Sequence, residues 1–409
     1  MKSAAPGAGF AMALGAVMLV SPLSVHLFLP ALPSVRSYFS ASEAVVEAAF
    51  SIALITMAVV TPVYGSLSDR YGRRPVLLSG LSLFVVGSLF SALATSIPML
   101  IGARLIQAMG AGCGITLARA IARDAYGSAA LVKAIAYLTM AYTLGPMIAP
   151  ALGGVLIDRF GWRSVFFLAL LAGVGITAGA YFAVAETRAP AERRAATGLI
   201  HHYAALMRDR RFLAFALQSG FMSFQFFAVA AASPFLMKNL LGRSATEYGL
   251  YFILFPLGFC SGNVISSRLS GKVAVETMVI VGSVLCAVVV GVQAALIAEG
   301  ELSPLLIFLP GGLMSFSQGL TLPNAQAGAI RIKLELAGTA AGLGVFIQML
   351  LSALSAQLFG EFADGTPLPM IWITCAGAVG ALACAAALMG GGRATAADPR
   401  PARPAEAKE

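Results

Sequence analysis

Charge is the scarcest property of this 409-residue sequence. Asp, Glu, Lys and Arg together make up 11% of the chain, while 59% of its residues are hydrophobic and the mean hydropathy is +0.86. Soluble domains carry about 25% charged residues. The composition therefore excludes a water-soluble enzyme of this length, and the excess of apolar residues excludes a disordered or collagen-like chain.

Cysteine and histidine are also few. All five cysteines lie in apolar stretches without C-x-x-C spacing, which excludes a disulfide framework and a zinc site and is typical of small buried hydrophobes. No catalytic triad, metal-ligand set or phosphate loop of the form G-x-x-x-x-G-K-[ST] is visible. We therefore expect a protein that is not an enzyme, that uses no cofactor or metal and that is not driven by ATP.

Long apolar runs are what the sequence has instead. A run of about 20 residues can cross a hydrocarbon core of about 30 Å, and lipid forces such a run to be helical. The first run follows Lys2 and could pass for a secretory signal, but the similar runs after it favour an uncleaved span. We predict an all-α integral membrane protein with twelve spans, at 9–31, 43–64, 76–95, 98–118, 131–156, 163–185, 212–236, 247–267, 275–297, 303–323, 338–359 and 370–389.

One long polar connection divides these spans six and six. It contains a basic cluster that includes Arg193, Arg194 and Arg208. We therefore predict an N-terminal domain at 1–186, a cytoplasmic linker at 187–211, a C-terminal domain at 212–390 and a disordered cytoplasmic tail at 391–409.

The basic residues predict the orientation. If the N-terminus is cytoplasmic, most of the 27 Lys and Arg residues lie on the cytoplasmic side, and the opposite side holds only Arg36, Arg159, Arg163, Lys238 and Arg243. We expect a multi-pass protein of the cell inner membrane with both termini in the cytoplasm. The net charge of +9 then reports orientation and gives no support to nucleic-acid binding.

The loop after the second span carries the most specific motif, Gly65-Ser-Leu-Ser-Asp-Arg-Tyr-Gly-Arg-Arg-Pro75. The sequence resembles the major facilitator superfamily, whose signature loop has this pattern. The resemblance implies two six-helix bundles with pseudo-two-fold symmetry, which rock around a central cavity. It also implies a conformational latch, for which the candidates are Gly65, Asp69, Arg70, Gly72, Arg73, Arg74, Arg119 and Arg123.

Two further motifs lie within spans. Arg104 and Gln107 resemble the R-x-x-Q-G motif of proton-coupled members, and they share one helix face. An arginine within a span is costly, so Arg104 should face a cavity or a partner unless it snorkels. The fifth span resembles an exporter motif, whose prolines bend the helix and whose glycines permit close contact with the other half. Its residues are Gly145, Pro146, Pro150, Gly153 and Gly154.

Two stretches resemble the Bcr/CflA-type drug:proton antiporters. They run from His26 to Pro33 and from Ala118 to Tyr126. This sequence has His26 where those transporters usually have an aspartate. A histidine can still exchange a proton near physiological pH, although a neutral histidine bonded within the bundle is the alternative.

The candidates for proton coupling or a central charge are His26, Arg104, Glu47 and Asp124, and among the titratable carriers His26 ranks first, then Glu47 and Asp124. If His26 and Arg104 line the cavity, it is neutral to positive, which favours a neutral or anionic substrate. A mostly apolar chamber with few polar groups suits amphipathic compounds. Its candidate residues, each of which could instead serve packing, are Gln107, Tyr137, Tyr142, Gln218, Phe224, Gln225, Phe227, Asn263 and Gln348.

The leading hypothesis is a monomeric secondary active transporter that exports small amphipathic compounds in exchange for protons. Its partners would be the small-molecule substrate, protons and the lipid bilayer, with no nucleic acid. A proton-coupled or facilitative importer of a small metabolite on the same fold is the alternative, because a fold does not determine direction.

Overall fold

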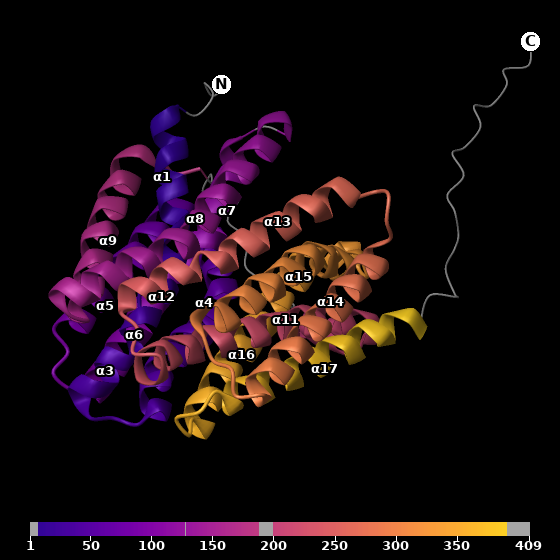
Figure 1. Ribbon diagram of the computed structural model, residues 1–409. Helices are drawn as coiled ribbons and strands as arrows, with labels where there is room; N and C mark the ends of the chain where they lie inside the picture. Colours follow the sequence, from indigo (N-terminus) through magenta and orange to yellow (C-terminus); the bar gives the residue numbers. More distant parts are fainter. Residues whose placement is uncertain (1–6, 127, 188–198, 391–409) are drawn as a thin grey trace, which may run out of the picture.

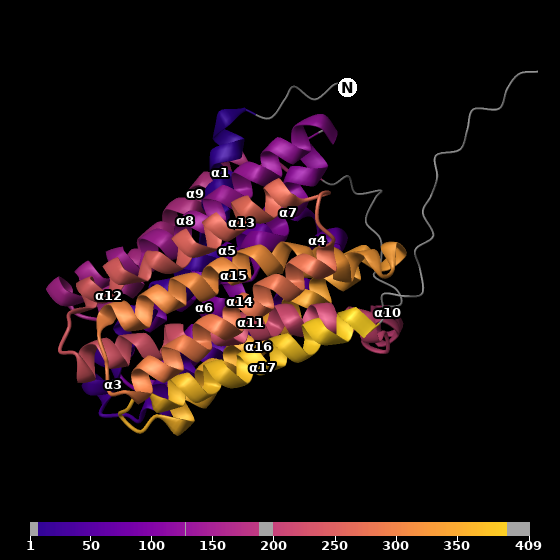
Figure 2. The same cartoon turned by 45° about the vertical axis from the view of Figure 1, so that its right-hand side comes forward.

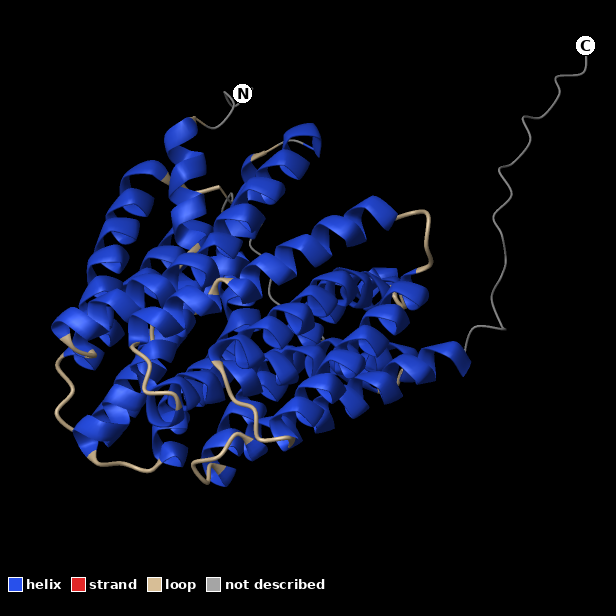
Figure 3. Ribbon diagram, in the orientation of Figure 1, coloured by secondary structure: helices blue, strands red, loops and turns tan. Residues whose placement is uncertain are grey.

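The computed structural model describes residues 7–126, 128–187 and 199–390. Apart from one isolated bridge between Ser270 and Val273, this part of the chain is built from helices and connecting loops and has no β-strand (Figure 3). Twelve helical segments in it are long and apolar enough to span a membrane, one for each predicted span. The predicted all-α membrane fold is confirmed.

The first six spans run from α1 to α9. Their elements are α1 (Ala8–Met18), α2 (Val20–His26), η1 (Leu29–Ala31), α3 (Leu32–Phe39), α4 (Glu43–Tyr71), α5 (Arg73–Ala92), α6 (Ile97–Ala111), α7 (Cys113–Ala125), α8 (Ser128–Phe160) and α9 (Arg163–Ala183). Proline interrupts the first span, since α2 contains Pro22 and the 3₁₀ turn η1 contains Pro30.

The other six spans run from α11 to α17. Their elements are α11 (Arg210–Phe235), the π-helical η3 (Leu236–Leu240), α12 (Ala245–Phe252), α13 (Leu254–Leu269), α14 (Val275–Ala298), α15 (Pro304–Arg331), η4 (Leu334–Leu336), α16 (Ala337–Phe362) and α17 (Leu368–Gly390). Between the two sets, α10 (Leu199–Met207) packs against α11 and α16. Arg193, Arg194, most of the predicted linker and the tail 391–409 lie outside the described residues.

Side-chain caps and glycine set several helix ends. Ser42, Ser96, Ser244 and Ser303 each accept a hydrogen bond from a backbone N–H in the first turn of the helix that follows. Some helices outlast the apolar runs. For example, α4 continues to Tyr71 beyond the predicted end at 64, because polar residues can extend a helix outside the hydrocarbon.

The two bundles repeat one packing plan. In the first bundle α5 packs against α6 and α9, and in the second α14 packs against α15 and α17. These helices are the third, fourth and sixth spans of each half. Between the bundles, the second span packs on the eleventh (α4 on α16) and the fifth on the eighth (α8 on α12), as pseudo-two-fold symmetry requires.

In the described part of the chain, the main contacts between the bundles lie towards one end. Twelve spans put the start of α1 and the end of α17 on the same side, called here the termini side, and the opposite side is the far side. The main apolar core includes residues of both bundles, whereas a second core around Phe212, Phe215 and Val279 on the termini side of the second bundle contains no residue of the first. Figures 1 and 2 both show the bundles diverging towards the termini side.

Candidate functional site: the junction between the bundles

The first contact between bundles on the far side is the α4/α16 seam. Gly360 lies so close to α4 that a Cβ there would come 2.9 Å from the Ala44 Cα and 2.8 Å from the Glu47 Cβ. The Ser51 hydroxyl donates to Oε1 of Gln357 (3.0 Å), whose Nε2 donates to the Ala44 carbonyl (3.3 Å). Close backbone approach and two hydrogen bonds therefore hold α16 against α4.

The second contact is the α8/α12 seam. A Cβ on Gly154 would lie 2.1 Å from the Ala245 carbonyl oxygen, and one on Gly249 would lie 2.4 Å from the Pro150 carbonyl oxygen. Each helix thus presents a glycine to the backbone of the other. This geometry explains why the exporter-like motif ends in glycine, since no other residue fits such an approach.

Asp158 ties the end of α8 to the start of α12. Its carboxylate accepts hydrogen bonds from the backbone N–H of Ala245 (3.2 Å) and of Thr246 (2.8 Å) and from the Thr246 hydroxyl (2.6 Å). A carboxylate at a helix N-terminus satisfies free N–H groups and complements the helix dipole. Asp158 is solvent-exposed, so its charge is retained at little cost.

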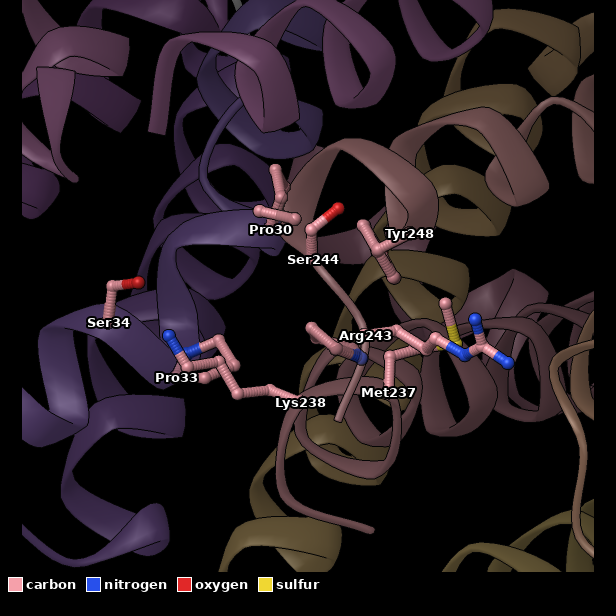
Figure 4. A pocket seen from close by; sticks show the side chains of 10 residues that line it. Pro30, Pro33, Ser34, Met237, Lys238, Arg243, Ser244 and Tyr248 are labelled. Atoms are coloured by element: carbon pink, nitrogen blue, oxygen red, sulfur yellow. The ribbon is translucent and has the colours of Figure 1, made fainter. Parts of the chain in front are cut away.

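Between the seams, side chains of both bundles close the far side. Pro30, Pro33 and Ser34 of the first span lie on one side of a small crevice, and Ser244 and Tyr248 lie on the other (Figure 4). The second bundle also contributes Pro234, Met237, Lys238, Arg243 and Ala245 to the lining.

Glu47 lies inside the α4/α16 seam. Its side chain is fully buried, and neither carboxyl oxygen has a hydrogen-bond partner. No cation pairs with it among the described residues. Its electrostatic neighbours are Glu43 on the same helix and Tyr248 of α12 in the other bundle.

His26 lies at the end of α2 and also faces the other bundle. Its ring is edge-on to Phe252 of α12, with 6.0 Å between centroids, and it is 7% exposed. Nδ1 has no hydrogen-bond partner. Since Phe252 follows Tyr248 by one helical turn, α12 packs close to both Glu47 and His26.

Arg104 has partners and, in this conformation, borders only a small crevice inside the first bundle, which it shares with Gln107 and Phe28. It is completely buried within the first bundle, where its guanidinium donates to the carbonyls of Ser24 (2.8 Å) and Ala49 (3.3 Å) and to the Gln107 side chain. It also lies 4.7 Å from the centre of the Phe28 ring. Arg104 therefore adds no positive charge to the space between the bundles in this conformation.

The signature loop forms an ion-pair cluster on the termini side. Arg73 pairs with Asp69 (2.9 Å) and with Asp124 of α7 (2.8 Å), and it donates to the Ser68 hydroxyl. Gly72, at φ 102°, allows α4 to end and α5 to begin without a linker. Arg70 and Gly65 lie beside the cluster, Arg70 over the Tyr71 ring and Gly65 facing Thr116.

Glu186 completes this cluster and was not predicted as a functional residue. Its two carboxylate oxygens accept the backbone N–H groups of Arg73 (2.9 Å) and Arg74 (3.2 Å), and so cap α5 from the end of the sixth span. The Arg74 side chain donates to the carbonyls of Val184 and Tyr181. These bonds join the third span to the sixth, and the Asp69–Arg73 pair adds the second span to the cluster.

The other two predicted latch residues differ from the rest. Arg119 is exposed and forms no ion pair with the described part of the chain, and its charge acts on the nearby Tyr142 hydroxyl. Arg123 is 66% exposed and reaches Asp124 only at 3.9 Å. The helices α1, α4, α5 and α8 pack around α7 within the first bundle, and the exposed side chains of Arg119 and Arg123 lie on its termini-side part.

Within the exporter-like motif the residues have different partners. Gly145 lies against Pro22 and Gly153 against Pro30 and the Leu27 carbonyl, both within the first bundle, whereas Gly154 contacts the second. Both prolines of the motif lie inside the single helix α8, at Pro146 and Pro150.

The predicted chamber residues fall into two groups. Four are buried inside the bundles, and three of these bond to neighbouring helices: Gln107 to Ser88, Gln218 to Ser283 and Gln225 to Cys286, while Phe224 is packed. The partly accessible or exposed ones are Tyr137, Tyr142, Phe227, Asn263 and Gln348. Of the predicted chamber residues, only the second group has accessible surface in this conformation.

Sequence reasoning also missed Asp158 and Gln357. A usable signal for Asp158 was present, since an acid at the end of a span beyond a glycine pair is suited to cap a helix that packs on those glycines. Gln357 gave no such signal, because a lone glutamine in a span is as often a packing residue.

Comparison with known proteins agrees with this architecture. Residues 14–356 match the model of the Major Facilitator Superfamily. The chain is 28% identical to an uncharacterized MFS-type transporter, YdgK, of Bacillus subtilis (87% of this chain, 89% of that one) and 29% identical to Multidrug resistance protein D of Escherichia coli (84% and 86%). The fold is shared with the xylose transporter XylE from E. coli, at a TM-score of 0.71 and 14% identity over 91% of this chain and 96% of that one. The chain belongs to the major facilitator superfamily.

Proposed function

We propose that this protein is a secondary active exporter of small amphipathic compounds that works by alternating access in exchange for protons. The observation that carries the proposal is the one-sided junction: both seams lie on the far side, and on the termini side the second bundle has a core of its own. Such a molecule can rock about a central site. The export direction is supported by Gly154, whose motif forms the α8/α12 seam.

We assign the termini side to the cytoplasm and the far side to the outside of an inner membrane, with a monomer as the working unit. The asymmetry of basic residues supports this orientation. The bacterial relative Multidrug resistance protein D aligns with most of this chain, which supports an inner membrane as the location. The divergent side, with Arg119 and Arg123, would then be open to the cytoplasm in this structure.

A neutral or anionic substrate fits the exposed charges better than a lipophilic cation. Arg119 carries no ion pair with a described residue and Arg123 only a long one, and both side chains are exposed on the termini side. We place them on the face of α7 that borders the open space. An unpaired positive charge attracts anions and repels cations. The sequence predicts that Arg104 supplies positive charge to the cavity. In the structure Arg104 is enclosed within its bundle, and the charge preference is supported by Arg119 and Arg123 instead.

For proton coupling we favour His26. It lies at the interface with an unpartnered Nδ1, so its surroundings change when the bundles rock. Asp124 is a weaker candidate, because its ion pair with Arg73 ties it to the latch cluster. His26→Gln should abolish transport driven by a pH gradient but preserve substrate binding, as measured with everted vesicles and a binding assay. Unaltered proton-driven efflux would eliminate His26 as the carrier.

The function is tested by expressing the protein in a pump-deficient host on a panel of toxic compounds. We expect resistance to neutral and anionic amphipathic compounds, lost in the presence of a protonophore. Comparable export of ethidium-like cations and of amphenicols would contradict the charge preference. Sensitisation to the compounds, with protonophore-sensitive uptake, would instead identify the importer.

A further inference from the structure

We propose that Glu47 is a proton-binding site built into the α4/α16 seam, and that the outer side closes only when Glu47 carries a proton. The proposal uses the orientation given under Proposed function, but it requires no particular substrate. It assigns a role in closure to Glu47 and leaves the transported proton to His26.

Protein encloses the carboxyl group of Glu47 on all sides. Glu47 is 0% exposed, and both of its oxygens lack a hydrogen-bond partner. An ionised carboxylate in such a place would lose its hydration without compensation, so the group is neutral there. Ser51, one turn further along α4, does find a partner across the seam in Gln357.

Among the described residues, no group around Glu47 supplies a counter-charge. On α4, Glu43 is already paired with Arg36 of α3 at 2.7 Å. On α16, Glu361 accepts a hydrogen bond from Gln357, and α12 contributes the Tyr248 phenol.

The loop after α16 adds only negative charge. The Thr366 hydroxyl and backbone N–H, which both bond to Asp364, lower the pKa of that carboxyl. Asp364 therefore stays ionised from pH 5 to 9, and its negative charge acts on Glu43, the electrostatic neighbour of Glu47.

The proton on Glu47 is linked to the movement of α16 relative to α4. The Cβ that Gly360 lacks would fall 2.8 Å from the Glu47 Cβ, so the glycine backbone covers the glutamate directly. Separation of α16 from α4 must therefore uncover Glu47 to water from the outer side. Once hydrated, the carboxyl can ionise as an ordinary glutamic acid does, at about pH 4.3.

The pH outside the membrane therefore changes the ratio of closed to open molecules. The closed seam holds the protonated form and the open seam permits the ionised form, so acid outside favours closure and alkali favours opening. Between the two titration ranges, the ratio of closed to open molecules falls up to tenfold for each unit of pH. An exporter that has released its substrate would thus close after taking up an external proton.

The test measures the separation of the bundles on the far side. Spin labels are placed at Phe160 and Phe362, which are 72% and 65% exposed at the far ends of α8 and α16, after the five native cysteines are replaced by alanine. Distances are recorded in lipid nanodiscs from pH 5 to 9 without substrate. We expect a short-distance population that falls as pH rises.

Glu47→Gln and Glu47→Met should both keep the short distance at every pH, because each removes the ionisable group and fills the seam. Glu361→Gln, an exposed carboxylate of the same seam, is the matched control and should retain the pH response of the parent. A parent without pH response, or a Glu47 variant that retains it, would overturn the proposal. Loss of drug export alone would bear only on the proposed function.

Discussion

The two seams occupy corresponding positions in the pseudo-two-fold arrangement but hold their acidic groups differently. In the α8/α12 seam, Asp158 is exposed and its carboxylate accepts three hydrogen bonds from Ala245 and Thr246. In the α4/α16 seam, Glu47 is enclosed and accepts none. One acid stabilises closure while charged, and the other can be accommodated only when neutral.

The two seams are therefore symmetric in their packing but not in their chemistry. The backbone approach is alike, since Gly154 and Gly360 both bring their helix close to a helix of the other bundle. What differs is access to water, and access decides whether a carboxylate is retained as an ion. We therefore expect the α4/α16 seam to make closure depend on pH. The α8/α12 seam should contribute to the free energy of closure by an amount that does not change with pH.

The largest effect should come from filling a seam. In Gly154→Leu the new side chain would meet the Ala245 backbone, which cannot move without displacing α12. Overpacking commonly costs about 1–3 kcal/mol, and against backbone we expect the upper end, about a hundredfold loss of the closed form. Far-side distances and efflux assays would both report it.

Gly360→Leu provides the internal comparison for that prediction. A Cβ there would come 2.8 Å from the Glu47 Cβ and 2.9 Å from the Ala44 Cα, which is less close than the 2.1 Å at Gly154, so its effect should be smaller than that of Gly154→Leu. Gly179→Leu on α9 is the control, because a Cβ there has nothing within 4 Å. Equal effects of all three leucines would show that the seams do not set closure.

The fold could be predicted almost entirely from the sequence, because lipid leaves apolar runs no alternative to helix. The spans were found, and the signature loop located the Asp69–Arg73 pair. Helix ends such as Tyr71 were missed because hydropathy measures the fit to lipid, whereas a helix ends where capping or glycine stops it.

The site could be predicted only in part. Arg104 and Gln107 were identified, yet which way they face depends on where α2 and α4 pack, and no local pattern encodes that. Glu47 was named from its type alone, and its isolation became evident only from the position of Gly360, far along the chain. Contacts between distant spans were the information that the sequence lacked.

An intermediate effect is expected from Asp158→Asn. The amide has one acceptor oxygen and no charge, so it can replace only part of the cap on α12. Loss of a helix cap costs about 1 kcal/mol, roughly fivefold in the ratio of closed to open molecules. The far-side distances should shift by this factor equally from pH 5 to 9. Glu301→Gln, in an exposed loop on the same side, is the control, and a changed pH response in Asp158→Asn would contradict the separation of the two seams.

The smallest effect should come from Ser51→Ala. This removes one neutral hydrogen bond across the α4/α16 seam, while the Gln357 amide keeps its bonds to the Ala44 carbonyl and to Glu361. Such a bond contributes about 0.5–1 kcal/mol, so closure should weaken two- to fivefold. Because Glu47 is untouched, the pH curve should move without changing its slope. A flattened slope would mean that Ser51, rather than enclosure by Gly360, maintains the neutral state of Glu47.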